Sequence, residues 1–304
     1  MKNSIFYRQA SLVLDILPLI AKVDEFALKG GTAINYFIRD LPRLSVDIDL
    51  TYLPIEDRPT TLESIHSIFN TLSKEITDTI SPNSISRKLN KTSQKIESLV
   101  IEHTGVTIKI EPNLIIRGSV YSPEIMTLVP SANKFFEKSV KVQSLSLEDL
   151  YGGKICAALD RQHPRDLFDI KILFENEGIT DKIRIAFIVY LISHNRPMNE
   201  LLNPTFQDIS YNYTAEFKDM TFNPITLDEL NHAREELVSQ LLSGLTESEK
   251  QFIISVKSKN PQWDLIDVKH VKDLPAVKWK LLNLEKMDKN SHKEALTKLI
   301  KIFE

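Results

Sequence analysis

Short segments in which hydrophobic and polar residues alternate occur throughout the first half of the chain. Residues 44–52 and 106–114 both alternate in this way, and a period of two predicts strands with one polar face. Residues 96–103 precede the second of these segments, and the Thr-Gly turn between them predicts a β-hairpin. A short apolar run at 26–28 predicts a further strand that ends at Lys29.

Helical spacing separates these strands and dominates the second half of the chain. Apolar residues recur every three to four positions in 6–22, 32–39 and 62–80, and Pro18 is expected to kink or end the first of these helices. Further helices are predicted at 147–159, 165–175, 181–193, 227–242, 247–257 and 276–287. Residues 195–224 contain three prolines and follow no regular pattern. The sequence therefore predicts a mixed α/β domain at 1–145 and a mainly helical domain at 146–304.

Composition agrees with a folded protein in water. Hydrophobic residues make up 42% of the 304 residues and charged residues 26%, which is ordinary for a globular chain. No segment approaches the roughly 20 apolar residues of a membrane span, and residues 1–17 lack the features of a signal peptide. The one cysteine, Cys156, has no partner for an internal disulfide. We therefore expect a cytoplasmic protein that does not enter a membrane.

Basic residues are concentrated towards the C-terminus, although the net charge of the whole chain is only -3. Residues 250–304 contain 12 lysines and 7 acidic residues. Such a region either contacts a polyanion or is an ordinary solvated helix surface, and the second case is the commoner one.

Two aspartates lie close together on the strand predicted at 44–52. Asp47 and Asp49 are two positions apart, so alternation directs both to one face while Ile48 enters the core. Adjacent carboxylates repel each other on a strand, and Mg²⁺, which prefers oxygen ligands, would remove that repulsion. Metals held in this way can activate an attacking hydroxyl and stabilise a leaving pyrophosphate. Taken alone, such a pair is more often merely solvated.

A pair of glycines, Gly30-Gly31, lies between a predicted strand and a predicted helix upstream of these aspartates. Only 8 glycines occur in the chain, and two pairs, of which Gly152-Gly153 is the other, account for half of them. Without Cβ atoms the turn can approach a phosphate closely, and the helix that begins near Thr32 offers unpaired N–H groups. Thr32 is expected to cap that helix or to donate to a phosphate. A lone Gly-Gly is usually an ordinary turn, but in this order with the aspartates it favours a metal–triphosphate site.

A third carboxylate lies on the strand predicted at 106–114, where Glu111 shares the polar face with Lys109. On a strand beside the aspartates, Glu111 would suit a second metal or a general base. The alternative, a surface glutamate, is equally well supported.

A second group of charged residues lies in the helical half of the chain. Lys154 belongs to an apolar helix, where a lysine usually extends its ammonium to solvent but can also bind a nucleotide phosphate. Arg161 follows near the same helical face. Pro164 suits the first turn of the next helix, so Arg165 and Asp166 lie at its N-terminus.

The same residues also have ordinary structural interpretations. Asp166 would complement the helix dipole, and Arg165 would form a salt bridge with Asp166 or with Asp169 on the same face. His163, in the preceding loop, has no evident partner.

Together these segments resemble the AbiEii/MenT-type nucleotidyltransferase toxins of the DNA polymerase β-like nucleotidyltransferase superfamily. These proteins are the toxin half of abortive-infection and toxin–antitoxin pairs. The resemblance covers most of the chain, and the combined order of the motifs is specific although each motif alone is weak. The matching segments are 28–33 (LKGGTA), 43–50 (RLSVDIDL), 108–111 (IKIE), 148–154, 165–169 (RDLFD) and 245–284.

The resemblance implies a bilobed α/β (α+β) structure, in which a mixed nucleotidyltransferase sheet with flanking helices precedes a mainly helical lobe. The expected nucleotide-binding residues are Gly30, Gly31, Thr32, Ser45, Lys154 and Arg165. The expected metal-binding residues are Asp47, Asp49 and Glu111. The expected catalytic residues are Asp47, Asp49, Lys154 and Asp166, the last as a candidate base.

Some members of the family transfer nucleotides to the 3′ acceptor end of tRNA and so block translation, whereas others are described as binding GTP. We therefore expect a toxin that transfers a nucleoside monophosphate from an NTP to tRNA, with Mg²⁺ or Mn²⁺ as cofactor and a cognate antitoxin as partner. The motifs do not distinguish CTP from GTP. Two alternatives remain, a nucleotidyltransferase with a protein or small-molecule acceptor, and a non-enzymatic regulator that binds an NTP.

Overall fold

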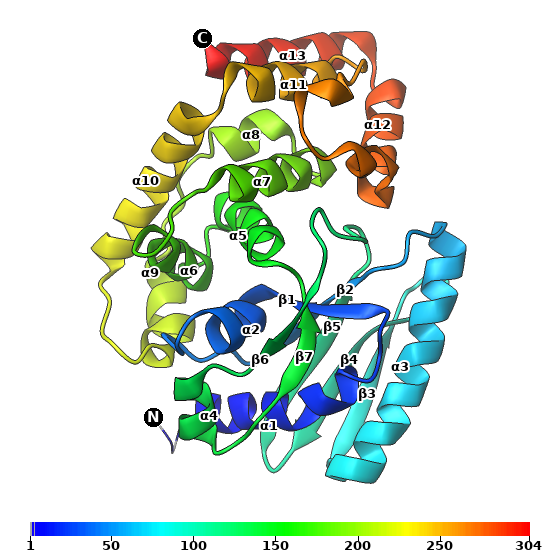
Figure 1. Ribbon diagram of the computed structural model, residues 1–304, viewed down its shortest axis with the longest axis vertical. Coiled ribbons are helices and arrows are strands. Elements are labelled where there is room, and N and C mark those ends of the chain that lie inside the picture. Colours follow the sequence, from blue (N-terminus) through cyan, green and yellow to red (C-terminus); the bar gives the residue numbers. More distant parts are fainter. Residues whose placement is uncertain (1, 3) are drawn as a thin grey trace. The chain divides into compact units, whose positions relative to one another are not determined.

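The computed structural model describes residue 2 and residues 4–304, and the chain divides into two compact units (Figure 1). The first unit runs to Leu147 and also includes Met220–Pro224, and the second comprises Glu148–Asp219 and Ile225–Glu304. That a unit is compact does not say what it does. The assignment of a catalytic domain to 1–145 and of a helical domain that contributes to the site to 146–304 therefore stays a prediction. Over the described part of the chain, no helix combines the length and apolarity that a membrane crossing requires.

Among the residues that the structure describes, a seven-stranded mixed sheet forms the centre of the first unit. Its strands lie in the order β3-β4-β5-β2-β1-β7-β6, and β2 runs antiparallel to β1 but parallel to β5. The fold is thus the α/β class that the sequence predicted. The strands are β1 (Phe26–Lys29), β2 (Ile48–Tyr52), β3 (Ser84–Leu89), β4 (Ile96–His103), β5 (Val106–Asn113), β6 (Glu124–Thr127) and β7 (Lys141–Ser144).

Helices α1 and α3 pack against one face of this sheet, where α1 contacts β5 and β7, and α3 contacts β4 and α1 (Figure 1). Phe26 anchors the core between them, since its ring lies 5.7 Å from that of Phe69 and 5.9 Å from that of Tyr52. Pro18 lies in the last turn of α1 and does not end it early. The helices of this unit are α1 (Ile5–Ile20), α2 (Gly30–Ala33), the π-helix η1 (Ile34–Ile38), α3 (Arg58–Ile80) and α4 (Pro130–Phe136).

The predicted hairpin is confirmed, because β4 and β5 pair antiparallel. Thr104 and Gly105 form its turn with φ values of 48° and 76°. This left-handed backbone is what a two-residue hairpin turn requires.

The second unit is helical, and α7 lies at its centre with nine of its residues buried. Gly152 lets α5 approach α7 closely, since a Cβ atom there would lie 2.8 Å from the backbone carbon of Ala186. Gly153 in turn faces the ring of Tyr190. The second glycine pair therefore serves helix packing. The helices are α5 (Leu147–Arg161), α6 (Pro164–Phe174), α7 (Asp181–Ser193), α8 (Met198–Leu202), α9 (Ser210–Asn212), η2 (Tyr213–Phe217), η3 (Lys218–Met220), α10 (Leu227–Gly244), α11 (Glu247–Lys257), η4 (Trp263–Leu265), η5 (Lys269–Asp273), α12 (Pro275–Lys286) and α13 (Lys289–Phe303).

Residues 195–224, which showed no regular pattern in the sequence, form short helices and end in a segment that completes the first unit. Leu44 N donates to Met220 O at 2.8 Å, and Phe222 N donates to Pro42 O at 3.2 Å. A segment distant in sequence therefore fixes the chain immediately before Ser45.

Candidate active site

The turn between β1 and α2 leaves no room for a side chain at either glycine. Gly30 has a φ of +74°, and a Cβ atom placed on it would lie 2.4 Å from Asp49 Oδ2. A Cβ atom on Gly31 would lie 2.6 Å from Arg43 Nη2 and 3.0 Å from Ser45 Oγ. Since only glycine fits without displacing these atoms, the predicted triphosphate turn lies directly against a predicted metal ligand and a predicted phosphate-binding serine.

Thr32 and Tyr36 fix the segment that carries Ser45 and Asp47. Thr32 Oγ1 donates to Asp47 O at 2.5 Å and lies 3.0 Å from Ser45 Oγ. The Tyr36 hydroxyl donates to Ser45 O at 2.6 Å and accepts from Ser45 N at 2.7 Å. Burial raises the pKa of Tyr36 above its ordinary range, so the hydroxyl keeps the proton that it donates.

The prediction that Thr32 caps the helix is wrong. α2 begins at Gly30, and Lys29 occupies the N-cap position without a side-chain cap. Because Thr32 is buried and its hydroxyl is directed at the carbonyl of Asp47, its expected contact with a phosphate stays a prediction that requires the hydroxyl to turn.

Asp49 and Glu111 occupy paired positions on neighbouring strands. Asp49 is the partner of Glu111 in the parallel β2–β5 pair and of Lys29 in the antiparallel β1–β2 pair. Paired residues on adjacent strands project to the same face, while Ile48 and Leu50 are buried on the opposite one. Three strands therefore place an ammonium and two carboxylates in a row across the sheet.

Asp47 lies outside this row, because β2 begins at Ile48 and not near residue 44 as predicted. The alternation that put Asp47 and Asp49 on one face therefore does not cover Asp47. The position of Asp47 follows instead from the hydrogen bond between its carbonyl and Thr32. The strand prediction failed over 44–47 because tertiary hydrogen bonds, rather than a neighbouring strand, hold this segment.

Glu111 forms an ion pair with Lys109, with 2.5 Å between Nζ and Oε2. Both side chains are more than a third exposed, so this pair contributes little to stability. Within residue 2 and residues 4–304, no three His, Cys, Asp or Glu side chains gather closely enough to hold a metal by themselves. The expected trio of Asp47, Asp49 and Glu111 is thus not assembled as a closed cluster.

The side chains that are present nevertheless fit a Mg²⁺–triphosphate. Mg²⁺ usually takes one or two carboxylates and completes its shell with water and substrate phosphates, so a closed protein cluster is not required. Because Gly30 has no Cβ, the carboxylate of Asp49 can lie directly against the glycine turn. Asp49 is therefore the residue whose position suits a metal ligand, Asp47 stays the predicted second ligand, and Glu111 is a neighbour of Asp49 within the row.

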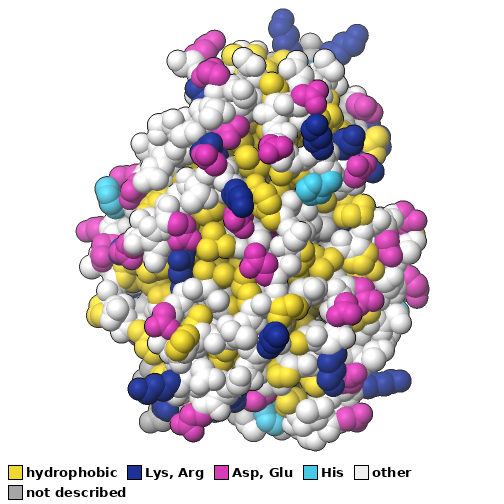
Figure 2. Space-filling view, in the orientation of Figure 1, with side chains coloured by type: hydrophobic (Ala, Val, Ile, Leu, Met, Phe, Trp, Pro, Cys, Tyr) yellow, Lys and Arg dark blue, Asp and Glu magenta, His cyan; other side chains and the backbone are white. Residues whose placement is uncertain are grey.

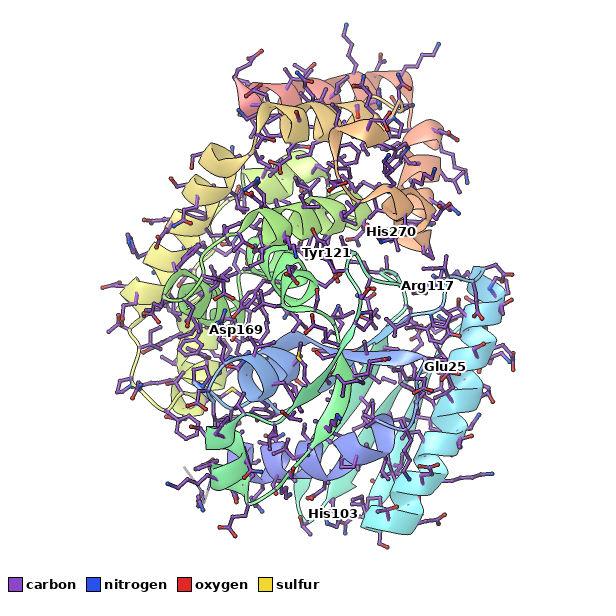
Figure 3. All side chains as sticks on the ribbon, viewed as in Figure 1. Glu25, His103, Arg117, Tyr121, Asp169 and His270 are labelled. Carbon is purple, nitrogen blue, oxygen red and sulfur yellow. The ribbon has the colours of Figure 1, made fainter. Side chains whose placement is uncertain are left out.

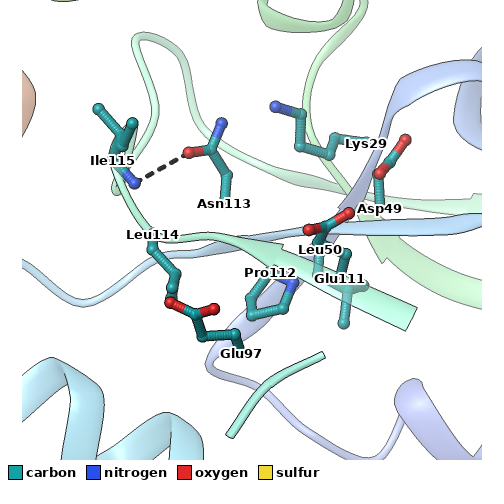
Figure 4. Close-up of a pocket in the computed structure, with 9 residues that line it drawn as sticks. All are labelled: Lys29, Asp49, Leu50, Glu97, Glu111, Pro112, Asn113, Leu114 and Ile115. Atoms are coloured by element: carbon teal, nitrogen blue, oxygen red, sulfur yellow. Dashed lines mark hydrogen bonds between the residues drawn. The ribbon is translucent and has the colours of Figure 1, made fainter. Parts of the chain in front are cut away.

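A cavity of about 320 Å³ opens beside Asp49 and Glu111 (Figure 4). Lys29, Glu97 and Asn113 contribute polar groups to its wall. The sequence reasoning missed these three residues. Their only signal is their strand register and the turn after β5, which the sequence does not specify.

Lys154 belongs to a buried ionic cluster within the second unit. Its ammonium lies 2.9 Å from Asp166 Oδ1 and 2.9 Å from Asp169 Oδ2, the residue labelled in Figure 3. The ammonium does not extend to solvent. Arg161 holds the same Asp166 with two hydrogen bonds, of 2.5 and 3.0 Å. Lys154, Asp166 and Asp169 are buried, whereas the side chain of Arg161 is 64% exposed and neutralises the second carboxylate from the surface.

The environment of Asp166 makes it a weak base. Burial by itself would raise the pKa of its carboxyl, but the charges and hydrogen bonds of Lys154 and Arg161 outweigh burial and hold that pKa below its usual range. Asp166 is therefore ionised at neutral pH and positions Lys154, which argues against its expected role as a proton acceptor.

His163 and Arg165 have roles at the start of α6. His163 Nδ1 accepts from Arg165 N at 3.1 Å as the N-cap of the helix, and its Nε2 lies 3.1 Å from Glu216 Oε2. His163 thus has partners that the sequence did not indicate. Arg161 forms the ion pair with Asp166, with 2.5 Å between Nε and Oδ2.

Charges are mixed on the molecular face shown in Figure 2, where acidic and basic side chains are interspersed. Two lysines of the C-terminal region, Lys257 and Lys280, are buried. The excess of lysine beyond residue 250 is thus only partly a surface property.

Comparisons with known proteins identify the family of the chain. The model of the family described as "Nucleotidyl transferase AbiEii toxin, Type IV TA system" matches residues 12–281. Among solved structures, the chain is similar to MenT4, a nucleotidyltransferase toxin from Mycobacterium tuberculosis H37Rv, at 13% sequence identity and a TM-score of 0.62. That similarity covers 92% of this chain and 93% of the other and concerns the fold. No curated protein matches the sequence. Because the family model spans most of the chain, from the glycine turn through Lys154 and Asp166, the chain belongs to the AbiEii family of nucleotidyltransferase toxins of type IV toxin–antitoxin systems and is a nucleotidyltransferase.

Proposed function

We propose that this toxin transfers a nucleoside monophosphate from a nucleoside triphosphate to the 3′ acceptor end of tRNA, releases pyrophosphate and so blocks translation. The observation that carries the proposal is the fit of the glycine turn against Asp49 and Ser45. A turn without Cβ atoms, a carboxylate and a serine hydroxyl are what a metal-bound triphosphate needs at close range.

Each predicted site residue has a distinct role in this proposal. Gly30, Gly31 and Ser45 bind the triphosphate, and Thr32 fixes the segment that carries Ser45. Asp47 and Asp49 hold Mg²⁺, which when bound neutralises charge on the phosphates. Manganese would suit the same oxygen ligands.

The reaction is a displacement at the α-phosphorus. The acceptor hydroxyl oxygen forms a bond to that phosphorus, the bond to the oxygen that bridges to the β-phosphate breaks, and pyrophosphate leaves. We assign the hydroxyl proton to Glu111, because Glu111 is paired with Asp49 across the two strands and Asp166 is a weak base.

Lys154, Arg165 and Asp166 are proposed to serve the same reaction. Lys154 has three donors, and its ion pairs with Asp166 and Asp169 hold the ammonium that we propose binds a phosphate. Asp166 and Arg161 orient that lysine, and Arg165 is a second candidate phosphate ligand.

The choice of tRNA rests on the family resemblance, and the lysines beyond residue 250 are compatible with it. We propose that the protein acts in the cytoplasm, where tRNA and nucleoside triphosphates are present. The cognate antitoxin is the further partner that membership of a toxin–antitoxin family implies.

Transfer can be tested with the purified chain, total tRNA, Mg²⁺ and each of the four α-labelled nucleoside triphosphates. We expect label to enter tRNA from one or two nucleotides and a chelator to abolish the reaction. Asp49→Ala should lower the rate by at least about a hundredfold. Asp78→Ala, which changes an exposed aspartate of α3, is the matched control and should react like the unmodified chain.

The same assay separates the two alternatives. Label on protein or small molecules with none on RNA would replace tRNA by another acceptor. Tight binding of a nucleotide without any transfer would favour a regulator.

A further inference from the structure

The cavity beside Asp49 and Glu111 is lined by all three charged residues of the row. β1, which leads into the glycine turn, flanks β2 on one side, and β5 flanks it on the other. The cavity wall consists mainly of the end of β5 and the residues that follow it, including Asn113 and Leu114 (Figure 4). Most of the cavity wall therefore lies on the β5 side of Asp49, although Lys29, which precedes the glycine turn, also lines the cavity.

This arrangement matters because phosphoryl and nucleotidyl transfers proceed in line. The attacking oxygen and the leaving oxygen stand on opposite sides of the reacting phosphorus. If the glycine turn binds the leaving pyrophosphate, the attacking hydroxyl must approach from the side of β5. That side holds the cavity, and Glu111 lies at its edge as the assigned proton acceptor.

Asn113 presents a fixed hydrogen-bond donor to this cavity. Its Oδ1 accepts from Ile115 N at 3.0 Å and from Ile116 N at 2.9 Å. These two bonds settle the orientation of the amide, so Nδ2 with its two hydrogens is directed away from the turn, and in Figure 4 it lies on the same side of the cavity as the Lys29 ammonium.

The other walls are suited to a flat, partly apolar group. Pro112, Leu114 and Ile115 line the cavity, and Ile115 is 46% exposed. An exposed isoleucine at the rim of a polar cavity gives an apolar surface on which a base can lie. A volume of about 320 Å³ is at the lower end of the range for small-ligand sites.

We propose that this cavity receives the 3′-terminal nucleoside of the RNA acceptor, with Asn113 Nδ2 donating to an acceptor atom of its base and Glu111 beside its 3′-hydroxyl. The inference rests on the proposed function and adds a subsite to it. Leu114 and Ile115 contact the base, and the Lys29 ammonium faces the transferred phosphate.

Asn113→Asp is the informative variant. It keeps an oxygen for both backbone N–H groups of the turn but replaces the donor by a carboxylate. Asn83→Asp is the matched control, because Asn83 Oδ1 likewise accepts a backbone N–H, from Thr104 at 2.8 Å, and lies outside the cavity wall.

The first measurement is the KM of each substrate in the transfer reaction. We expect Asn113→Asp to raise the KM for tRNA about three- to tenfold, as the loss of one hydrogen bond predicts, and to leave the KM for the nucleotide within about twofold. Asn83→Asp should change neither. A rise in the KM for the nucleotide alone would overturn the proposal, because the cavity would then hold the base of the incoming triphosphate.

The second measurement is equilibrium binding of intact tRNA and of tRNA that lacks its 3′-terminal nucleotide, without a nucleoside triphosphate. The unmodified chain should bind the shortened RNA more weakly, and Asn113→Asp should bind the two RNAs equally. Equal binding of both by the unmodified chain would overturn the subsite. This readout needs no transfer, so it stays separate from a failure of the proposed reaction.

Discussion

At the scale of single residues, Gly31 offers a direct test of the nucleotide site. A methyl group at this position would lie 2.6 Å from the guanidinium of Arg43 and 3.0 Å from Ser45 Oγ. Because Arg43 is buried, it has little freedom to move away, and the added carbon should displace Ser45. We predict that Gly31→Ala raises the KM for the nucleotide by about tenfold or more while the chain stays folded, as measured by steady-state transfer and circular dichroism.

Gly244 provides the matched control for this prediction. A Cβ atom there meets nothing within 4 Å, and the residue ends α10. Gly244→Ala should leave transfer unchanged and stabilise the chain slightly, by up to about 1 kcal/mol. Normal nucleotide affinity in Gly31→Ala would show that this turn does not hold the triphosphate.

The buried carboxylate of Asp166 leads to a prediction about stability. Asp166→Asn would remove the carboxylate that both Lys154 and Arg161 contact, so the buried ammonium of Lys154 would keep only Asp169 as a charged partner. Breaking one partner of a buried ionic group typically costs about 3–5 kcal/mol. We predict a loss of this size in the free energy of unfolding, measured by chemical denaturation, whereas Asp264→Asn on the surface should change it by less than about 0.5 kcal/mol.

The same carboxylate predicts a pH dependence. Lys154 and Arg161 lower the pKa of Asp166 in the folded chain below its ordinary value of 3.8, so its contribution to stability is fully present above about pH 4. That contribution is lost as the pH falls further, towards the folded-state pKa. The free energy of unfolding of the unmodified chain should therefore fall more steeply below pH 4 than that of Asp166→Asn, and parallel curves would contradict the ion pairing.

At the scale of elements, the helices and strands that were predicted correctly are those with a regular pattern of hydrophobic and polar residues. The hairpin of β4 and β5 and the helices α7 and α11 follow from such patterns. The strands β3, β6 and β7 were missed, since β3 is largely exposed and the other two are only four residues long.

The candidate site was likewise predicted only in part. The glycine turn and Asp49 follow from strand–turn–helix order, and alternation nominated Glu111. Asp49 lies beside Lys29 and Glu111 because of the register between the strands. Ser45 lies beside Gly31 because Thr32 and Tyr36 hold the loop that carries Ser45. Neither is encoded in a local pattern, so Lys29 and Asn113 were not predicted.

The contact of α12 with the end of α7 gives a prediction at this scale. Lys280 donates to His194 O at 2.5 Å and to Arg196 O at 3.2 Å and so caps α7. Burial and the nearby charge of Lys257 nevertheless lower the pKa of Lys280 from 10.5 to about 8. Between these two values the unfolded chain binds the proton more strongly than the folded chain.

The unmodified chain should therefore become more stable as the pH rises from about 8 towards 10.5, by on the order of 1–3 kcal/mol from this group. Lys280→Met removes the titrating group, and its unfolding free energy should lack this rise. The difference between the two denaturation curves is the measurement, since other groups that titrate in this range cancel. An identical pH dependence would contradict the burial of a charged lysine.

At the scale of the whole chain, the first unit is completed by a segment that follows helices α5–α9 in sequence. Met220–Pro224 belongs to the first unit although both flanking segments belong to the second. The segment supplies hydrogen bonds to residues 42–44 and packs Phe222 against Phe135 at 5.1 Å. The chain between Arg43 and Asp47 is thus fixed from two sides, by this segment and by Thr32, and the proposed nucleotide site depends on both.

This dependence predicts how a single backbone change distant in sequence affects the site. Phe222→Pro removes the N–H group that donates to Pro42 O, and it restricts the backbone of the preceding residue, which pairs with Arg43. The loss of this hydrogen bond should allow local opening around Leu44, so the amide hydrogen of Leu44 should exchange about tenfold faster. Nucleotide transfer should also become slower, because Ser45 directly follows Leu44. Phe222→Ala keeps the N–H group and should alter exchange less, and the amides of α7 should be unaffected in both variants. Unchanged exchange at Leu44 in a folded Phe222→Pro chain would mean that residues 42–44 are held by the α2 side alone.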